Sequence, residues 1–544
     1  MQFRAGLSCG VALGAFLAAD GALAQTVVTV GRDEVLGNVN IPGDGTVTNN
    51  GTVLGDVFIS DDGTVTNTGT IGGGVLILND DFVLEGHTVT NSGTIGGDVV
   101  IEGGTITNTG TIVGIARQTG FGTITNSGSL GGAHVFVPGT LNLLAGSVIH
   151  GGIDFSFPGS TLNLGHGQNM ALTLTGSLPA INSFGAPMAV QGLVVAVVDP
   201  TGFSAQDEML TDLTRAIANA VDGRINSGRF GYAPAAPVLS YAAAGSGADT
   251  QPAAFGYPMG STGATSSGYG FWASGIGAWR DQDADGADTG FDTSLGGLLV
   301  GLDGELANGM RLGGFLGAST SRFETDPNSQ EIDADSYFGG VYGSYAGQNY
   351  FLDASLTGGV SQQSSDRTVA NNLVLGGIEH ATADYDGVFI SPSATIGTTF
   401  AMANGSTFIP SFRARYAGLF LDGYDESGSA ANLSVDDRDV NIFDLRAQLA
   451  YALAALPSGN GAVHATFRIG ADATFADNAN VDANLLGTAL NFDVSGDDTV
   501  RGFAGIDLNY RAEGGMNFFL GAEAGYDSGN AFTLDVNGGL RIPL

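Results

Sequence analysis

The sequence predicts an all-β protein with an N-terminal parallel β-helix (solenoid), a short amphipathic helix and a C-terminal 12-stranded antiparallel transmembrane β-barrel. Three observations lead to this fold class. The phrase Thr-Val/Ile-Thr-Asn recurs five times between residues 46 and 126. Apolar residues recur at helical spacing between residues 203 and 225. Residues 269–544 contain twelve alternating segments with alternately short and long connections, which is the pattern of an outer-membrane barrel.

Residues 1–24 follow the pattern of a secretory signal peptide. Arg4 precedes an apolar stretch, and Ala22-Leu23-Ala24 is a small-x-small cleavage site that places the mature start at Gln25. Cys9 is the only cysteine and lies in this segment. We therefore expect an exported chain without disulfides, held together by its β-ladders.

The charge balance excludes several classes of function. The chain has 54 Asp and Glu residues and a formal net charge of −36, and all 18 basic residues are arginine. Nucleic-acid binding needs clustered positive charge, so we expect no nucleic-acid partner. The lack of lysine excludes a P-loop lysine and a Schiff-base lysine, and we predict no cofactor.

The repeat region predicts a solenoid over residues 25–200. The five phrases begin at Thr46, Thr64, Thr88, Thr105 and Thr123, which are 18, 24, 17 and 18 residues apart. A period near 20 residues is typical of stacked rungs. Alternation predicts an interior ladder of Val and Ile, with Asn at the corners. Degenerate rungs follow at 140–143 and 161–164 and end near Val198.

Two groups in the solenoid are candidate sites. His134, His150 and His166 are each 16 residues apart, so they are either stacked metal ligands or polar residues at equivalent turns. The carboxylate pairs Asp61-Asp62 and Asp80-Asp81 suggest glycoside hydrolysis. However, adjacent residues on a strand point to opposite faces, and we predict no catalytic residue here.

Residues 201–230 are predicted to form an amphipathic helix before the barrel. Its apolar stripe is Leu210, Leu213, Ile217, Ala220 and Val221. Ser204 is the expected N-cap, with Asp207 completing a capping box and Gly228 lying past the end.

The place of this helix has two interpretations. It either packs beneath the solenoid or lies in the barrel lumen as a plug, where Arg215, Arg224 and Arg229 meet acidic residues. Residues 231–268 form a linker rich in Ala, Gly, Ser and Pro, and a linker of this length fixes no geometry. Whether helix 203–225 closes the pore therefore stays open at this point.

The barrel prediction covers residues 269–544. Its expected strands are 269–280, 291–303, 310–323, 335–346, 349–362, 384–400, 407–421, 437–455, 461–475, 498–511, 516–527 and 531–544. Short periplasmic turns alternating with long outer loops place both ends of the barrel on the periplasmic side. Aromatic residues near strand ends, among them Trp272, Trp279, Phe291 and Phe389, are expected in interfacial girdles.

The first outer loop contains a metal-like motif. Asp281, Asp283, Asp285 and Gly286, with Asp292 at position twelve, have the spacing of a calcium loop. The motif lacks flanking helices and has Asp in place of the bidentate Glu. An acidic outer loop is the favoured interpretation, and we predict no metal ligand.

The C-terminal half resembles the translocator of monomeric autotransporters, the type V secretion proteins. The segments that carry the resemblance are Phe271-Trp272-Ala273 through Trp279, Gly297–Asp303, Ser336–Tyr345, Phe408–Ser411 and Asp199-Pro200-Thr201. The resemblance implies insertion in outer-membrane lipid by the barrel assembly machinery, after escort by periplasmic chaperones. It also implies that residues 25–200 are a displayed passenger. One departure is the last residue, Leu544, where such barrels usually end on an aromatic residue.

The sequence therefore predicts a bacterial outer-membrane protein whose barrel, expected to be monomeric, exports an acidic β-helical passenger to the cell surface. We expect the passenger to be adhesive, with a host-cell or matrix receptor as its partner, rather than an enzyme. No nucleophile elbow outside the leader and no HExxH motif occur. A displayed hydrolytic enzyme and a diffusion porin are the alternatives. Cleavage of the passenger is not predicted either way.

Overall fold

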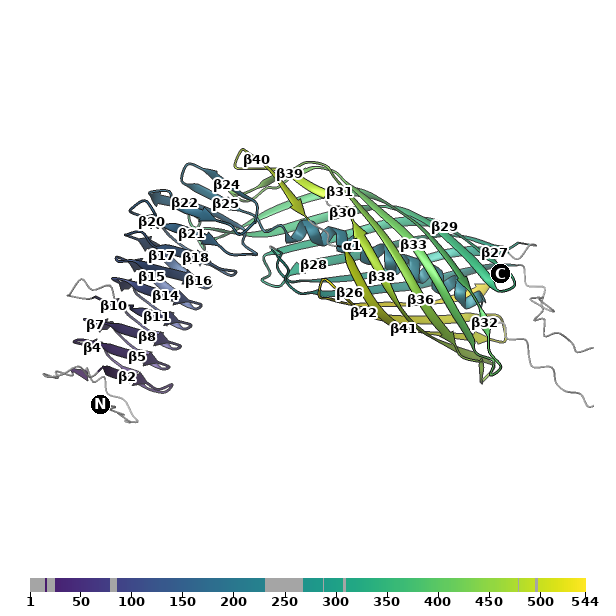
Figure 1. The fold of residues 1–544 in the computed structure, drawn as a ribbon, viewed down its shortest axis with the longest axis horizontal. Coiled ribbons are helices and arrows are strands. Elements are labelled where there is room, and N and C mark those ends of the chain that lie inside the picture. The colour runs from purple at the N-terminus through teal and green to yellow at the C-terminus, as the bar shows by residue number, and fades with distance from the viewer. Residues whose placement is uncertain are drawn as a thin grey trace, which may run out of the picture.

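The computed structural model describes residues 15–16, 25–78, 86–229, 268–286, 288–306, 310–477, 479–494 and 498–544. A solenoid leads into a helix that lies inside a barrel (Figure 1). Apart from β1 (Ala15–Phe16), the expected signal peptide lies outside the described residues, and so does the linker except for Gly268.

Stacked rungs form the solenoid, as predicted. One face is a sheet of nine parallel strands: β2 (Thr26–Val30), β5 (Gly45–Asn49), β8 (Gly63–Asn67), β11 (Thr88–Asn91), β14 (Gly104–Asn108), β16 (Gly122–Asn126), β18 (Thr140–Leu143), β21 (Thr161–Leu164) and β23 (Ala180–Asn182). We call it the nine-stranded sheet. The other faces consist of β3 (Val35–Leu36), β4 (Val39–Ile41), β6 (Thr52–Val53), β7 (Val57–Ile59), β9 (Thr70–Ile71), β10 (Val75–Ile77), β12 (Thr94–Ile95), β13 (Val99–Ile101), β15 (Thr111–Gln118), β17 (Ser129–Val135), β19 (Val148–Ile149), β20 (Ile153–Phe155) and β22 (Met170–Gly176).

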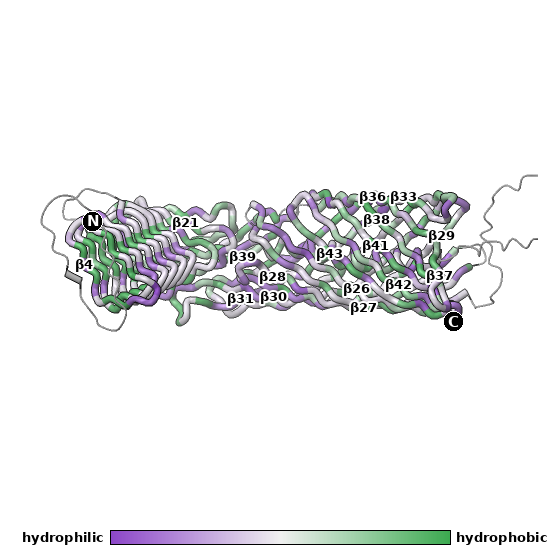
Figure 2. The backbone as a smooth tube through the Cα atoms, turned by 90° about the horizontal axis from the view of Figure 1, so that it is seen from below, coloured by the Kyte–Doolittle hydropathy of each residue, from purple (hydrophilic) through white to green (hydrophobic). Residues whose placement is uncertain are grey.

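The repeated phrase explains this stacking. Its central residues, Val47, Val65, Val89, Ile106 and Ile124, are fully buried in one ladder, and such ladders appear as stripes across the rungs (Figure 2). Burial of each side chain contributes about 1.5–3 kcal/mol. The phrase asparagines lie inside the corner, where each donates its Nδ2 to the Oδ1 of the next rung at 2.7 Å, from Asn49 through Asn67, Asn91 and Asn108 to Asn126.

The last part of the solenoid differs from the predicted rungs. After β22, the hairpin of β24 (Met188–Gln191) and β25 (Val194–Val197) folds back antiparallel onto β22. Gly192 allows the reversal with a φ of 64°, a backbone conformation that glycine adopts without a steric penalty. The hairpin replaces the final parallel rung.

Twelve antiparallel strands form the barrel: β26 (Tyr269–Gln282), β27 (Phe291–Glu305), β28 (Met310–Thr325), β29 (Gln330–Ala346), β30 (Tyr350–Asn371), β31 (Ile378–Thr398), β33 (Thr407–Leu421), β36 (Arg438–Ala452), β38 (Gly461–Ala476), β41 (Thr499–Ala512), β42 (Asn517–Asp527) and β43 (Ala531–Pro543). Pairing of β26 with β43 closes it. Two short strands, β32 (Phe400–Ala401) and β37 (Leu456–Ser458), extend neighbouring turns. In the C-terminal strand, Phe532 and Ile542 are exposed on the outer face, so the apolar row continues to Leu544.

The strands differ from prediction mainly at the long-loop end. β29, β30 and β31 continue past the expected strand ends, and Glu331 still pairs with Asp366 in the ladder. Polar residues can extend a hairpin into water, because ladder hydrogen bonds do not require an apolar face. The expected loops also contain a four-stranded sheet of β34 (Tyr424–Asp425), β35 (Leu433–Val435), β39 (Ala479–Leu485) and β40 (Thr488–Val494).

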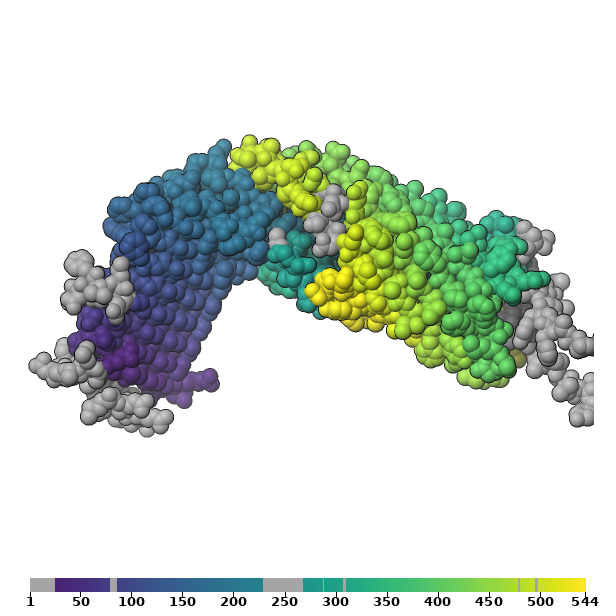
Figure 3. Space-filling view, viewed as in Figure 1, coloured from purple at the N-terminus to yellow at the C-terminus, as the bar shows by residue number. Residues whose placement is uncertain are grey.

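The solenoid contacts the long-loop end of the barrel (Figure 3). β22 runs parallel to β30 through Met170↔Ala370. The Asn372 side chain accepts from the Thr173 amide at 2.8 Å and donates to the Thr173 and Gly151 carbonyls at 2.9 and 3.1 Å. A shared apolar cluster includes Ala171, Val198, Val369 and Leu485. The hairpin of β30 and β31, which we call the outer hairpin, therefore covers the end of the solenoid that faces the barrel.

Candidate functional site: the barrel lumen

A single long helix fills much of the lumen. α1 (Thr201–Arg229) has 29 residues and is about 43 Å long at 1.5 Å per residue. Gly202 donates its backbone N–H to Gln330 at the loop end of β29, and Asn517, at the turn end of β42, donates to the Ser227 carbonyl. The helix therefore runs from the loop end to the turn end and is the plug rather than a packing helix beneath the solenoid.

The helix begins at Thr201, before the expected N-cap Ser204, and Asp199 is its N-cap. Asp199 Oδ1 accepts from the Thr201 amide at 3.1 Å and from its hydroxyl at 2.5 Å. Burial raises the pKa of Asp199, and the two Thr201 hydrogen bonds act against this rise. Ser204, the expected N-cap, lies within the helix and donates to the Thr201 carbonyl. Gly228 is also helical rather than beyond the end.

The apolar stripe of α1 packs against apolar residues of the lumen wall. Leu213, Ile217 and Val221 join a buried cluster with Trp272, Ile276, Leu299 and Phe315 of the wall. Trp272 was expected in an interfacial girdle but is fully buried, and Phe291 and Phe389 are 4% and 1% exposed. These rings occupy inward positions beside small residues, and Trp272 lies over Gly301. Trp279, by contrast, is 48% exposed on the outer face.

The polar stripe of α1 meets arginines of the wall. Arg280 of β26 contacts Asp212 at 3.0 Å and Glu208 at 2.5 Å. Two further pairs are Arg438–Asp207 and Arg413–Asp222, each at 3.2 Å. Because both faces of the helix have partners, nearly all its described side chains are buried.

The predicted helix arginines behave differently from one another. Arg224 pairs with Asp303 of β27 at 2.6 Å, and the Tyr342 hydroxyl donates to the same carboxylate. The Arg224–Asp303 ion pair is therefore the predicted contact between a helix arginine and an acidic residue of the lumen. Arg215 instead pairs at 3.1 Å with Asp212, on its own helix. The side chain of Arg229 lies outside the described residues.

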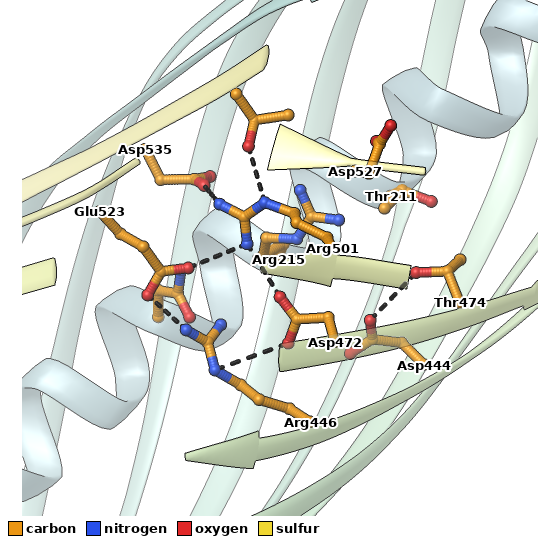
Figure 4. Close-up of polar contacts among 12 residues, drawn as sticks. Thr211, Arg215, Asp444, Arg446, Asp472, Thr474, Arg501, Glu523, Asp527 and Asp535 are labelled. Atoms are coloured by element: carbon orange, nitrogen blue, oxygen red, sulfur yellow. Dashed lines mark hydrogen bonds and ion pairs between the residues drawn. The ribbon is translucent and has the colours of Figure 1, made fainter. Parts of the chain in front are cut away.

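The wall beside the helix holds an ion-pair network centred on Glu523 of β42 (Figure 4). Arg446, Arg468 and Arg501 each donate to its carboxylate, the last two at 3.0 Å. Arg501 also pairs with Asp472 at 2.8 Å. These residues come from the neighbouring strands β36, β38, β41 and β42, so the network links four strands of the wall.

Sequence reasoning did not identify the wall arginines as partners of the helix. Arg413 and Arg415 lie two residues apart on β33, on its inward face. The signal was present in the alternation, because arginines in phase with inward positions point to the lumen.

A cavity of about 70 Å³ lined by both polar and apolar side chains remains between the helix and the wall. Its lining includes Asn219, Asp222, Asp353, Arg413 and Arg468. A cavity of this size holds only a few water molecules. This cavity therefore leaves space for water between the helix and the wall.

The candidate metal residues lie apart from the lumen. His134 contacts Asp154 and Ser156 at 3.0 and 2.8 Å, and His150 contacts Ser129 at 2.9 Å. The His166 ring lies 5.9 Å from that of Phe184. The structure does not bring these three histidines together into a group of possible ligands within its described residues.

The acidic motifs have two different arrangements. Asp281 pairs directly with Asp292 in the β26–β27 ladder, and both side chains are exposed at its outer end. In the solenoid, Asp61 and Asp62 lie at a turn and their carboxylates gather with Asp44, with ligand atoms within 4.8 Å of one another. Asp80 and Asp81 lie outside the described residues.

In the described part of the chain, no helix has both the length and the apolar character needed to cross a membrane.

Comparisons with known proteins found similar solved structures and similar curated proteins. Two solved structures are similar: the translocator domain of autotransporter NalP from Neisseria meningitidis (17% identity, TM-score 0.41, 51% of this chain and 88% of that chain) and the β-domain of the Bordetella autotransporter BrkA (19%, 0.38, 51% and 100%). The esterases EstA of Pseudomonas aeruginosa and Pseudomonas putida are 27% identical over 163 residues. That match spans 29% of this chain and 24% of each relative.

The family of the chain follows from the match to a whole domain. The family model described as Autotransporter beta-domain matches residues 271–543, half of the chain. Its limits coincide with the twelve-stranded barrel, which opens at Tyr269 and ends at Pro543. The chain therefore belongs to the autotransporters, outer-membrane proteins in which a C-terminal β-domain serves the secretion of a passenger.

Proposed function

We propose that residues 25–200 are the passenger, that residues 1–24 are a signal peptide removed on export, and that the passenger acts as an adhesive surface module. Residues 201–230 form the helix that follows the passenger through the pore. Residues 231–268 link that helix to the barrel of residues 269–544 at the turn end.

One observation carries the proposal: the solenoid is docked on the long-loop end of the barrel while α1 leads back to the turn end. β22 pairs with β30 at the loop end, and the Leu544 amide donates to the Tyr269 carbonyl at the opposite end. A chain with this path has its passenger on one side of the membrane and both barrel ends on the other.

The partners follow from this arrangement. Outer-membrane lipid surrounds the exposed apolar residues of the barrel, such as Leu298, Leu316 and Val388. Periplasmic chaperones and the barrel assembly machinery deliver and insert the chain, and one chain forms the closed barrel. A host-cell or matrix receptor is the proposed ligand of the passenger.

A displayed hydrolase is the second candidate, favoured by the partial similarity to the esterases EstA. Adhesion and hydrolysis make different predictions for intact cells that express the full chain. We expect binding to host cells or to immobilised matrix proteins, lost when residues 25–200 are deleted, and no hydrolysis of short-chain esters. Ester hydrolysis that disappears with the same deletion, without any change in binding, would favour the enzyme instead.

A further inference from the structure

The outer surface of the nine-stranded sheet carries two ranks of threonine. The strand register aligns them rung by rung: Thr46, Thr64, Thr88, Thr105 and Thr123 in the first rank, and Thr48, Thr66, Thr90, Thr107 and Thr125 in the second. The 24-residue interval between the second and third phrases does not shift this register, since Thr88 still pairs with Thr64.

The two ranks form a regular rectangular lattice. Threonines two residues apart on a strand are about 6.6–6.8 Å apart, and neighbouring rungs are about 4.8 Å apart. At the corner where these strands end, each asparagine from Asn49 to Asn108 donates a 2.7 Å hydrogen bond to the asparagine of the next rung, as far as Asn126. Side-chain ladders of this kind keep stacked strands flat, so the lattice persists over five rungs.

The threonines are held firmly in place. The residue between each pair, such as Val65 or Val89, is fully buried, and a β-branched side chain has restricted χ1 freedom. Among the described residues, two hydrogen bonds reach these hydroxyls: Gln25 donates to Thr46 and Asn142 donates to Thr125, each at 3.0 Å. The other hydroxyls face solvent as donors and acceptors, each beside a methyl group.

This face is also free of charge. The outward positions that flank the five rungs are Val27 and Thr29 on one side, and Thr140, Asn142, Thr161, Asn163, Ala180 and Asn182 on the other. None is ionisable, in a chain with a formal net charge of −36. Charge complementarity therefore points to a neutral ligand.

We propose that the threonine face binds the surface of an ice crystal. A flat two-dimensional lattice of hydroxyl and methyl groups complements a ligand that is itself a lattice of hydrogen-bonding oxygens. On a prism face of hexagonal ice, the oxygens repeat on a rectangle with spacings close to those of the threonines. A neutral polysaccharide chain is a poorer fit, because the outward positions of the five rungs offer neither aromatic stacking platforms nor a groove.

Ice-affinity partitioning of the purified full chain in detergent tests this proposal. An ice hemisphere is grown slowly in the protein solution, and the fraction of protein in the ice is measured. We expect the wild-type chain to be enriched in the ice. A Thr66→Tyr/Thr90→Tyr variant should enter the ice only in the small fraction in which the detergent itself is trapped. Val100→Tyr places the same ring outward on β13, away from the nine-stranded sheet, and is expected to behave as wild type.

Exclusion of the wild-type chain from ice overturns the proposal. The proposal also fails if Val100→Tyr loses as much ice enrichment as the double threonine variant. Resistance of the solenoid to trypsin verifies folding. Thr66→Lys/Thr90→Lys, which adds charge without a ring, is the second variant if the tyrosines prevent folding. Loss of self-association by these variants with no ice enrichment of wild type would assign the face to a second copy instead. The assay uses purified protein, so its outcome is independent of the adhesion assay.

Discussion

Deletion of residues 201–229 is expected to convert a closed barrel into an open channel. α1 contacts strands on opposite sides of the lumen through Arg280, Arg413 and Arg438, and nearly all its described side chains are buried. Without the helix, the lumen is a water-filled pore lined by charged residues. In planar bilayers we expect conductance to rise on the order of tenfold or more over wild type.

Deletion of residues 234–262 is the matched control for this measurement. It removes the same number of residues from the linker, keeps α1, and should leave the barrel closed, because nine remaining residues can still span about 30 Å. High conductance of the wild-type chain would support the diffusion porin. Equal conductance with and without the helix would show that α1 does not close the pore.

Glu523→Gln is expected to destabilise the barrel strongly. Glu523 is 2% exposed and accepts from Arg446, Arg468 and Arg501. The amide has the same size but no charge, and it leaves three arginines in the lumen wall without their shared counter-ion. Removing one partner of a buried ion pair typically costs about 3–5 kcal/mol. The measurement is the midpoint of urea unfolding, followed by heat modifiability on a gel.

Glu331→Gln is the comparison variant for that experiment. Glu331 pairs with Arg322 at 2.6 Å, but the two side chains are 36% and 50% exposed. An exposed pair of this kind contributes about 0–1 kcal/mol, so its midpoint should stay near that of wild type. An equal drop in the urea midpoint of the two variants would mean that burial does not determine how much these ion pairs contribute to stability.

Alternation and repetition predicted most of the fold. The repeated asparagines and the buried Val and Ile residues predicted the register of the rungs, because residues at equivalent positions of successive repeats stack on one another. The twelve barrel strands followed from period-two alternation, and the family match at residues 271–543 agrees with their extent. The loop-side ends of the strands were not predicted, because β30 and β31 continue there as ladders of polar residues. Such ladders lack the alternation of apolar and polar residues from which the strands were predicted.

The lumen could be predicted only in part. Helical spacing identified the apolar stripe of α1, but only the structure distinguished a lumen helix from one that packs beneath the solenoid. Trp272 was misplaced because only its position near a strand end was considered, although the alternation along β26 puts it in phase with inward residues. Its burial over Gly301 is a tertiary contact. The N-cap at Asp199 was missed because Pro200 intervenes, and the Ser204–Asp207 spacing imitated a capping box.

Cysteine labelling on intact cells tests most directly whether the solenoid end of the molecule is outside. Cys9 is the chain's one cysteine, so a Cys9→Ser background makes single labels specific. Leu375 lies fully exposed on the outer hairpin, and Ser458 is exposed at a turn of the opposite end. A membrane-impermeant maleimide should label Leu375→Cys in intact cells and Ser458→Cys only after the outer membrane is opened. Labelling of Ser458→Cys in intact cells with Leu375→Cys protected would contradict the export of the solenoid through this barrel.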